Sequence, residues 1–127
     1  MTGERKTSEG ATLTSDELLT VLSAVANPHR MRIVAELGHG RVHVSELARR
    51  LGLSRPLLYM HLDKLEKAGL VAGQLELSED GKAMKYFELA PFDLRLNAET
   101  ITSAVGGDGA EGDVVDTRET DEEGTSP

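Results

Sequence analysis

The chain has 127 residues, which suits one small domain with tails, and 39% of them are hydrophobic although only 3% are aromatic. It has no cysteine, and this excludes disulfides, thiolate catalysis and cysteine-built zinc or iron–sulfur sites. No apolar run approaches the roughly 20 residues of a membrane span, and the N-terminus lacks the apolar core of a signal peptide. The sequence therefore predicts a cytoplasmic protein with no membrane partner.

The net charge of −8 is unevenly distributed along the chain. Residues 28–85 contain ten Lys and Arg against seven Asp and Glu, whereas residues 106–127 contain eight acids and one Arg. The central part is therefore mildly basic, and the acidic total does not argue against a nucleic-acid partner. Residues 1–12 and 106–127 are polar or acidic and are predicted to be disordered tails. This leaves residues 13–105 as the domain.

Two helices and a short strand are predicted at the start of this domain. In TSDELLTVLSAVAN, apolar residues recur at helical spacing, and Thr14 and Glu17 form a capping-box pair at the start. Asn27 followed by Pro28 predicts the start of a second helix, because proline has no amide to leave unbonded at the first helical position. The segment RVHV, residues 41–44, has the alternation of a short strand.

The next segment has the pattern of a helix-turn-helix. Ser45 is predicted to cap a short helix, ELARRL, that ends at Gly52. Ser54 is predicted to cap a second helix that runs to Ala68 before Gly69. Two helices joined by LGLS are typical of DNA-binding helix-turn-helix motifs, in which the second helix enters the major groove.

After Gly69 the hydrophobic period changes from that of a helix to that of a strand. LVAGQLEL and AMKYFELA predict two strands joined by a turn with Asp-Gly at its tip. A short helix is predicted from Ala98, with Asn97 as its cap. The predicted fold class is mainly α with a small β hairpin (α+β), in the order of a winged helix-turn-helix.

Three segments together span about residues 16–89: ANPHRMRIVAEL, VSELARRLGLSRPLLYMHLDKLEKAGLV and GKAMKYFEL. They resemble the ArsR-type winged helix-turn-helix transcriptional regulators. The resemblance implies a homodimer that binds double-stranded DNA in two half-sites and usually represses transcription.

Metal sensing, which the family often combines with DNA binding, is not supported by these residues. Metal-sensing members carry two cysteines near the start of the helix that here holds Glu46, and His43 and Ser45 stand at the matching positions. The family's second metal site, on a long C-terminal helix, has no counterpart in NAETITSAV. The sequence predicts no metal site and no cofactor, and no residue pattern identifies a small-molecule effector.

The candidate DNA contacts lie on the helix-turn-helix and the hairpin. In the second helix, a step of 100° per residue places Leu58, Leu62 and Leu65 on the buried side, so that the opposite side faces outward. Arg55 can donate two hydrogen bonds to guanine, and exposed apolar side chains can contact thymine methyls. The predicted contacts are Ser54, Arg55, Pro56, Leu57, Tyr59, Met60, Asp63 and Lys64 on this helix, Arg49 and Arg50 on the preceding helix, and Lys82 and Lys85 on the hairpin.

The apolar surface of the same helix leaves a second interpretation open. Leu57, Tyr59 and Met60 could instead bind another protein, in which case the chain would be a winged-helix interaction module. Catalysis has no support in the sequence, because no nucleophile elbow and no phosphate-binding glycine loop is present. The expected function is a sequence-specific transcriptional regulator that is not an enzyme.

Overall fold

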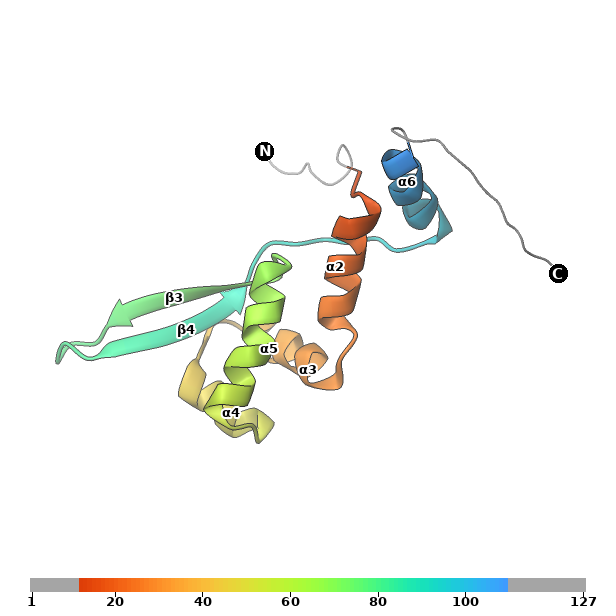
Figure 1. Ribbon diagram of the computed structural model, residues 1–127. Helices are drawn as coiled ribbons and strands as arrows, with labels where there is room; N and C mark the ends of the chain where they lie inside the picture. Colours follow the sequence, from red (N-terminus) through yellow and green to blue (C-terminus); the bar gives the residue numbers. More distant parts are fainter. Residues whose placement is uncertain (1–11, 110–127) are drawn as a thin grey trace. The chain divides into compact units, whose positions relative to one another are not determined.

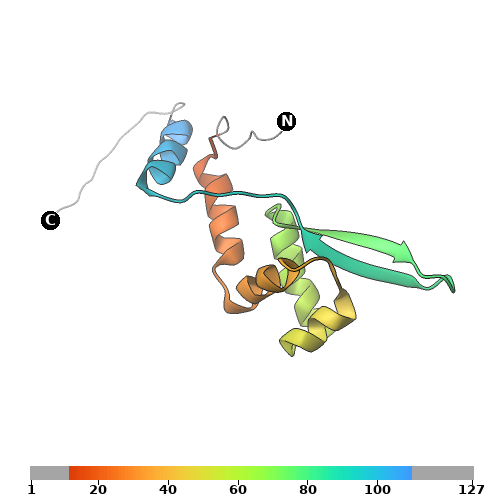
Figure 2. The ribbon, with the colours of Figure 1, turned by 180° about the vertical axis from the view of Figure 1, so that it is seen from behind.

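A computed structural model describes residues 12–109, which form helices and a small antiparallel sheet (Figures 1 and 2). The helices are α2 (Ser15–Val25), α3 (Pro28–Leu37), α4 (Val44–Leu51), α5 (Arg55–Lys67) and α6 (Ala98–Gly109), and the strands are β2 (Val42–His43), β3 (Val71–Leu77) and β4 (Ala83–Leu89). The predicted class, mainly α with a small β hairpin, is confirmed. The predicted tails lie outside the described residues except for residues 12 and 106–109.

The chain divides into two compact units. One unit is Thr20–Phe92, which holds the end of α2, helices α3 to α5 and most of the sheet. The described part of the other unit is residues 12–19 and 93–109, which include the start of α2 and all of α6. The predicted helix-turn-helix and hairpin both belong to the first unit.

The first two helices begin where their capping residues predict. At the start of α2, the backbone N–H of Glu17 donates to Thr14 Oγ1 at 3.1 Å, and the N–H of Thr14 donates to Glu17 Oε1 at 2.9 Å. At the start of α3, Asn27 Oδ1 accepts from the backbone N–H groups of His29 and Arg30. These bonds satisfy amide groups that the first turn of a helix leaves without partners.

The predicted start of α4 at Ser45 is wrong by two residues. The cap is His43, whose Nδ1 accepts from the backbone N–H of Ser45 at 3.1 Å, and Val44 is the first helical residue. His43 is also the last residue of β2, where it pairs with Tyr86 of β4, and Val44 is fully buried. The strand therefore passes directly into the helix, and the Ser45 hydroxyl takes no part in capping it.

Loss of the His43 cap is expected to weaken the start of α4. We predict that His43→Ala lowers the free energy of unfolding by about 1 kcal/mol, because one backbone amide loses its acceptor. Urea unfolding of both proteins measures the difference. His43→Asn is the matched control, since its side-chain oxygen can accept the same bond, and an equal loss in both variants would contradict a capping role.

The sheet has the strand order β2-β4-β3, with both pairs antiparallel. In the β3–β4 hairpin, Val71 pairs with Leu89 at the base and Leu77 with Ala83 near the turn. Gly81 in the turn has φ 83°, a left-handed conformation that favours glycine. The hairpin extends beyond α3, α4 and α5 in both views (Figures 1 and 2). It is the wing of the predicted winged helix, and the predicted short strand adds a third strand to its sheet.

An aliphatic core joins the helices of this unit to the sheet. Leu58, Leu62 and Leu65 of α5 are 0% exposed, which confirms the buried side predicted from the helical period. The other buried members of this core are Ala24, Ile33, Leu37, Val42, Val44, Leu47, Ala48, Leu51, Leu70, Val71 and Phe87. Because α5 packs against α3, α4 and β3, its outward face is held in a fixed orientation.

In the other unit, α6 starts as predicted but ends later. Asn97 Oδ1 accepts from the backbone N–H of Thr100 at 2.9 Å, as an N-cap does. The helix then continues through Gly106 and Gly107 to Gly109, beyond the predicted boundary at residue 105. Glycine disfavours a helix interior by only about 1 kcal/mol relative to alanine, so a glycine-rich composition does not fix where a helix ends.

Candidate nucleic-acid interface

The first turn of α5 presents an exposed arginine beside a capped helix start. Ser54 Oγ accepts from the backbone N–H of Leu57 at 3.3 Å, which confirms the predicted cap. Arg55 and Pro56 occupy the first two helical positions and are exposed. The Arg55 Nη1 donates to Ser45 Oγ of α4 at 3.0 Å, a contact between the two helices that the sequence did not predict.

The outward face of α5 carries the apolar residues that the sequence predicted there. Leu57 is 37% exposed, Tyr59 38% and Met60 48%. Further along the helix, the exposed Asp63 pairs with Lys67 at 3.1 Å, one turn later. This pair partly neutralises the negative charge of Asp63 within the helix itself, and leaves Lys64 with no ion pair among residues 12–109.

His61 lies on the buried side of α5. It is 4% exposed, and its Nδ1 accepts from Arg30 Nε at 3.1 Å, while the His29 ring lies 5.3 Å away. Burial lowers the pKa of His61, and the charges of Arg30 and His29 lower it further. A neutral imidazole that accepts a hydrogen bond inside the core has a structural role, so His61 is not part of the exposed face.

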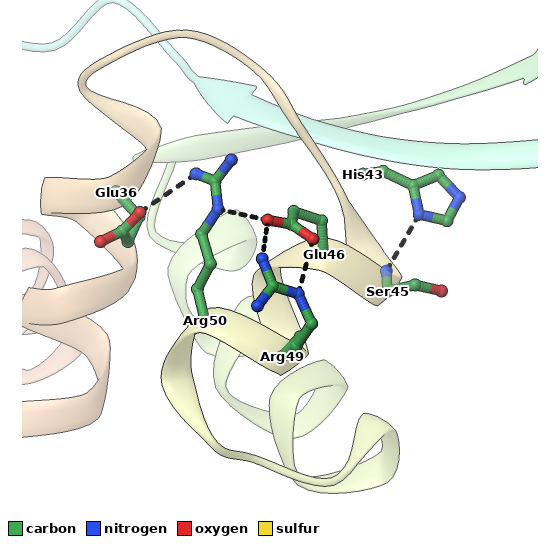
Figure 3. A network of polar contacts seen from close by, with 6 residues as sticks. All are labelled: Glu36, His43, Ser45, Glu46, Arg49 and Arg50. Atoms are coloured by element: carbon green, nitrogen blue, oxygen red, sulfur yellow. Dashed lines mark hydrogen bonds and ion pairs between the residues drawn. The ribbon is translucent and has the colours of Figure 1, made fainter.

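Arg49 and Arg50 of α4 share one carboxylate (Figure 3). Glu46 accepts from both side chains, and Arg50 also donates to Glu36 of α3 at 3.1 Å. The hydrogen bonds from Arg49 and then Arg50 lower the pKa of Glu46 to about 2, so this carboxyl is ionised at neutral pH. The Arg49 side chain remains 71% exposed, against 39% for Arg50, which makes Arg49 the more available of the two for a phosphate.

The two predicted wing lysines differ in their surroundings. Lys82 is exposed at the turn, where its backbone N–H donates to Ser78 Oγ at 3.1 Å. Lys85 is half-buried on β4, and its ammonium lies 5.5 Å from the centre of the Phe87 ring. Lys82 is therefore the more exposed of the two predicted wing lysines.

A third basic residue at the wing was not predicted. The Arg41 guanidinium lies 4.2 Å above the centre of the Tyr86 ring, donates to Gln74 at 3.3 Å and forms an ion pair with Glu76. The positive charge of Arg41 is thus paired with a carboxylate of the sheet. The only sequence signal was its place at the start of RVHV, which does not reveal a partner 35 residues away.

Comparison with known proteins assigns the chain to a family. A model described as a helix-turn-helix domain matches residues 25–74. The HTH-type transcriptional regulator MJ0229 of Methanocaldococcus jannaschii is 38% identical over 78 residues, which are 61% of this chain and 81% of that protein. The chain belongs to the helix-turn-helix transcriptional regulators. The residues that match this family model contain α3, α4 and α5.

Two solved structures are similar in fold to this regulator. HlyU from Vibrio cholerae is 30% identical, with a TM-score of 0.51 over 61% of this chain and 78% of HlyU. The homodimeric winged helix-turn-helix DNA-binding domain Mb0332 from Mycobacterium bovis, a possible ArsR-family regulator, is 21% identical, with a TM-score of 0.52 over 87% and 91% of the two chains. The winged helix fold expected from the ArsR resemblance is confirmed.

Among residues 12–109, no group of three or more His, Asp or Glu side chains could hold a metal ion. No helix in this range is long and apolar enough to cross a membrane. The candidate functional site is the exposed surface of α4, α5 and the wing, where the predicted contacts lie.

Proposed function

We propose that this regulator binds double-stranded DNA at a specific sequence, with α5 in the major groove. The observation that carries the proposal is the exposed Arg55 at the first helical position of α5, beside the apolar surface of Leu57, Tyr59 and Met60. The N-terminal residues of the second helix of a helix-turn-helix are those that contact base edges.

The side chains of α5 differ in what they can contribute to binding. Arg55 can donate two hydrogen bonds to guanine O6 and N7, and Met60 or Leu57 can contact the methyl group of thymine. Tyr59 can donate to a phosphate or pack on a sugar. Asp63, one turn later, can accept from cytosine N4. A site with guanine near its outer edge and thymines beside it fits these groups.

Affinity without sequence preference comes from phosphate contacts. Arg49 and Lys64 are exposed in the helix-turn-helix, and Lys82 is exposed at the wing. Arg50 and Lys85, which the sequence also predicts, are more restrained by Glu36 and Phe87. Such contacts release counterions from DNA, so that binding weakens steeply as salt concentration rises.

The proposed assembly is a homodimer that acts on two half-sites. The homodimeric state of Mb0332 supports it, and two copies would place their α5 helices in successive major grooves about 34 Å apart. Repression of transcription follows when such a site overlaps a promoter. A cytoplasmic location and the absence of catalysis belong to the same proposal, since the chain is a member of a family of transcriptional regulators. Sedimentation of the chain alone tests the homodimer.

The direct test is fluorescence anisotropy on labelled DNA from upstream of the protein's own gene, beside a scrambled duplex, at low and physiological salt. Arg55→Ala is expected to weaken binding to the native duplex by about tenfold and to reduce the preference over the scrambled one. Arg95→Ala, which removes an exposed arginine outside the helix-turn-helix unit, is the matched control. Equal affinity of the wild type for both duplexes at both salt concentrations would contradict the proposal.

A second candidate function rests on the exposed apolar side chains of α5, which suit a protein partner as well as a DNA groove. In that case Tyr59→Ala and Met60→Ala leave DNA binding unchanged and reduce binding of another protein. The strength of that interaction would be nearly independent of salt, because apolar contact releases no counterions. Loss of DNA affinity in both variants excludes this alternative.

A further inference from the structure

The contact between Arg55 and Ser45 joins the start of α5 to the start of α4. Both residues are exposed, and the bond uses one N–H of Nη1 with a donor–acceptor distance of 3.0 Å. A guanidinium has five N–H donors in a fixed planar arrangement. The Nε and Nη2 groups of Arg55 therefore remain available for a base edge while Nη1 is held.

The acceptor in this contact is a neutral hydroxyl, and the acid next to it in the chain bonds other arginines. Glu46 follows Ser45 in the chain and, in its ionised form, bonds both Arg49 and Arg50 (Figure 3). Arg55 is thus oriented by a hydroxyl rather than neutralised by a carboxylate. Its positive charge stays available to DNA.

Ser45 is itself fixed from the sheet. Its backbone N–H donates to His43 Nδ1 at 3.1 Å, and Figure 3 shows the His43 ring directed toward it. The same ring packs edge-on against Tyr86 of β4, with ring centres 5.4 Å apart and an interplanar angle of 81°. The backbone of Ser45, which carries the hydroxyl, is therefore joined to strand β4 through His43.

The chain of contacts continues from β4 to the outer strand of the wing. Arg41 lies over the Tyr86 ring at 4.2 Å and pairs with Glu76 of β3. The contacts form a continuous series from Glu76 through Arg41, Tyr86, His43 and Ser45 to Arg55. The wing and the first residue of α5 are thus joined by polar and ring contacts in addition to the aliphatic core.

We propose that Ser45 is a positioning residue for DNA recognition: it holds the Arg55 guanidinium in the direction in which it meets a guanine, and His43 and Tyr86 set that direction relative to the wing. An unrestrained arginine side chain samples many rotamers, and ordering it upon binding is costly. A side chain already held through one of its own N–H groups loses less freedom on binding, so affinity and base preference both increase. The inference rests on the proposed contact of Arg55 with DNA.

A double-mutant cycle tests this dependence. Operator affinity is measured by anisotropy for the wild type, Ser45→Ala, Arg55→Ala and the double variant, on the native duplex and on duplexes with single base-pair changes. Ser45→Ala alone is expected to weaken binding about threefold to tenfold and to reduce the preference at the base pair that depends on Arg55. In the Arg55→Ala background, removing the hydroxyl is expected to have no further effect.

Further measurements distinguish a role of Ser45 in positioning Arg55 from a role in the stability of the fold. Because the Ser45 hydroxyl does not cap α4, the urea midpoint of Ser45→Ala is expected to equal that of the wild type. Ser45→Thr keeps the hydroxyl and is expected to retain affinity and base preference. The dependence of affinity on salt is expected to be unchanged, since no phosphate contact is lost.

Three outcomes would overturn the inference: equal losses in both arginine backgrounds, tighter binding by Ser45→Ala, or loss of binding in proportion to loss of stability. The first would mean that Ser45 contacts DNA directly, and the second that its bond holds Arg55 away from DNA. In each case Arg55→Ala still weakens binding, so the proposed function stands. If Arg55→Ala has no effect, the proposed role of Arg55 itself fails.

Discussion

Leu62→Ala is expected to lower the free energy of unfolding by about 2–5 kcal/mol, the cost of removing a buried leucine side chain and leaving a cavity. Leu62 is 0% exposed in the middle of α5, in the same core as Leu58 and Leu65. A small domain has a total stability of about 5–15 kcal/mol, so this loss is a large part of it. Chemical unfolding in urea, followed by circular dichroism, measures the change in midpoint.

Leu75→Ala is the matched control for this substitution. Leu75 lies in β3 of the wing and is 67% exposed, so the same truncation removes little buried surface. Its free energy of unfolding is expected to change by less than about 0.5 kcal/mol. Equal midpoints for the two variants would mean that Leu62 is not packed as the structure has it.

The consequence of Leu62→Ala for DNA binding follows from the same packing. The residues of α5 that face outward depend on the buried side of that helix for their orientation. Where the variant remains folded, its operator affinity is expected to fall less than in Arg55→Ala, because no proposed DNA contact is removed. Substitutions on the outward face of α5 are therefore expected to change mainly DNA affinity, and substitutions on its buried face mainly stability.

Much of the fold could be predicted because its signals are local. The caps at Asn27 and Ser54, the left-handed Gly52 that ends α4, and the apolar period of α5 each depend on residues within one or two turns. Together with the strand alternation on either side of Asp80-Gly81, they define a helix-turn-helix followed by a hairpin. The candidate site could be predicted from the same signals. The helix-turn-helix pattern indicates α5 as the DNA-binding helix, and its exposed side is the one opposite the buried leucines.

The start of α4 could not be predicted locally because two residues competed for the same role. His43 and Ser45 can both accept a backbone N–H, and serine is the commoner cap. The pairing of His43 with Tyr86 in the sheet and the burial of Val44 decide the competition, and the partner strand lies far along the chain. The Ser45 hydroxyl is free to accept from Arg55 because His43, and not Ser45, caps α4. The contact between Ser45 and Arg55 could therefore not be predicted from the sequence either.

The partners of charged side chains could not be predicted from nearby residues either. Arg50 reaches Glu36 on a different helix, and Arg41 reaches Glu76 across the sheet. Helical spacing places Arg49 and Arg50 within reach of Glu46, but spacing alone does not tell which guanidinium stays free for a phosphate. Only the exposed fractions of the two side chains distinguish them.

Arg30 provides the second large effect expected from a single substitution. Its Nε donates to His61 Nδ1 at 3.1 Å, and its Nη1 donates to the backbone carbonyls of Ser23 and Ala24 at 3.3 and 3.4 Å. It therefore joins the end of α2 to the buried side of α5. Arg30→Met is expected to lower the free energy of unfolding by about 1.5–3 kcal/mol, because the acceptors lose a charged donor and two of them, on His61 and Ala24, belong to buried residues.

Urea unfolding of Arg30→Met measures this loss, with Arg32→Met as its matched control. Arg32 is two residues along the same helix and is exposed, so the same replacement there is expected to change stability by less than about 0.5 kcal/mol. Both substitutions remove one positive charge from α3. Equal effects would therefore show that the hydrogen bonds of Arg30 do not contribute to stability.

The same cluster is expected to make stability depend on pH. Burial, then the charges of Arg30 and His29, lower the pKa of His61 below its ordinary value of 6.5. The unfolded chain therefore binds a proton at pH values where folded His61 remains neutral, and proton binding favours unfolding. The contribution of His61 to stability is complete above pH 6.5 and falls as the pH drops through that value toward the folded pKa.

Comparison with His61→Asn isolates this contribution from the other groups that titrate in the same range. The Asn oxygen can accept from Arg30 in place of Nδ1 but does not titrate. Between pH 7.5 and pH 5 the wild type is expected to lose more stability than the variant, by at most about 1.4 kcal/mol per pH unit for one proton. Parallel urea series for the two proteins would show the difference. If their stabilities change equally with pH, the folded and unfolded chains protonate His61 alike, and the core does not hold this imidazole in its neutral form.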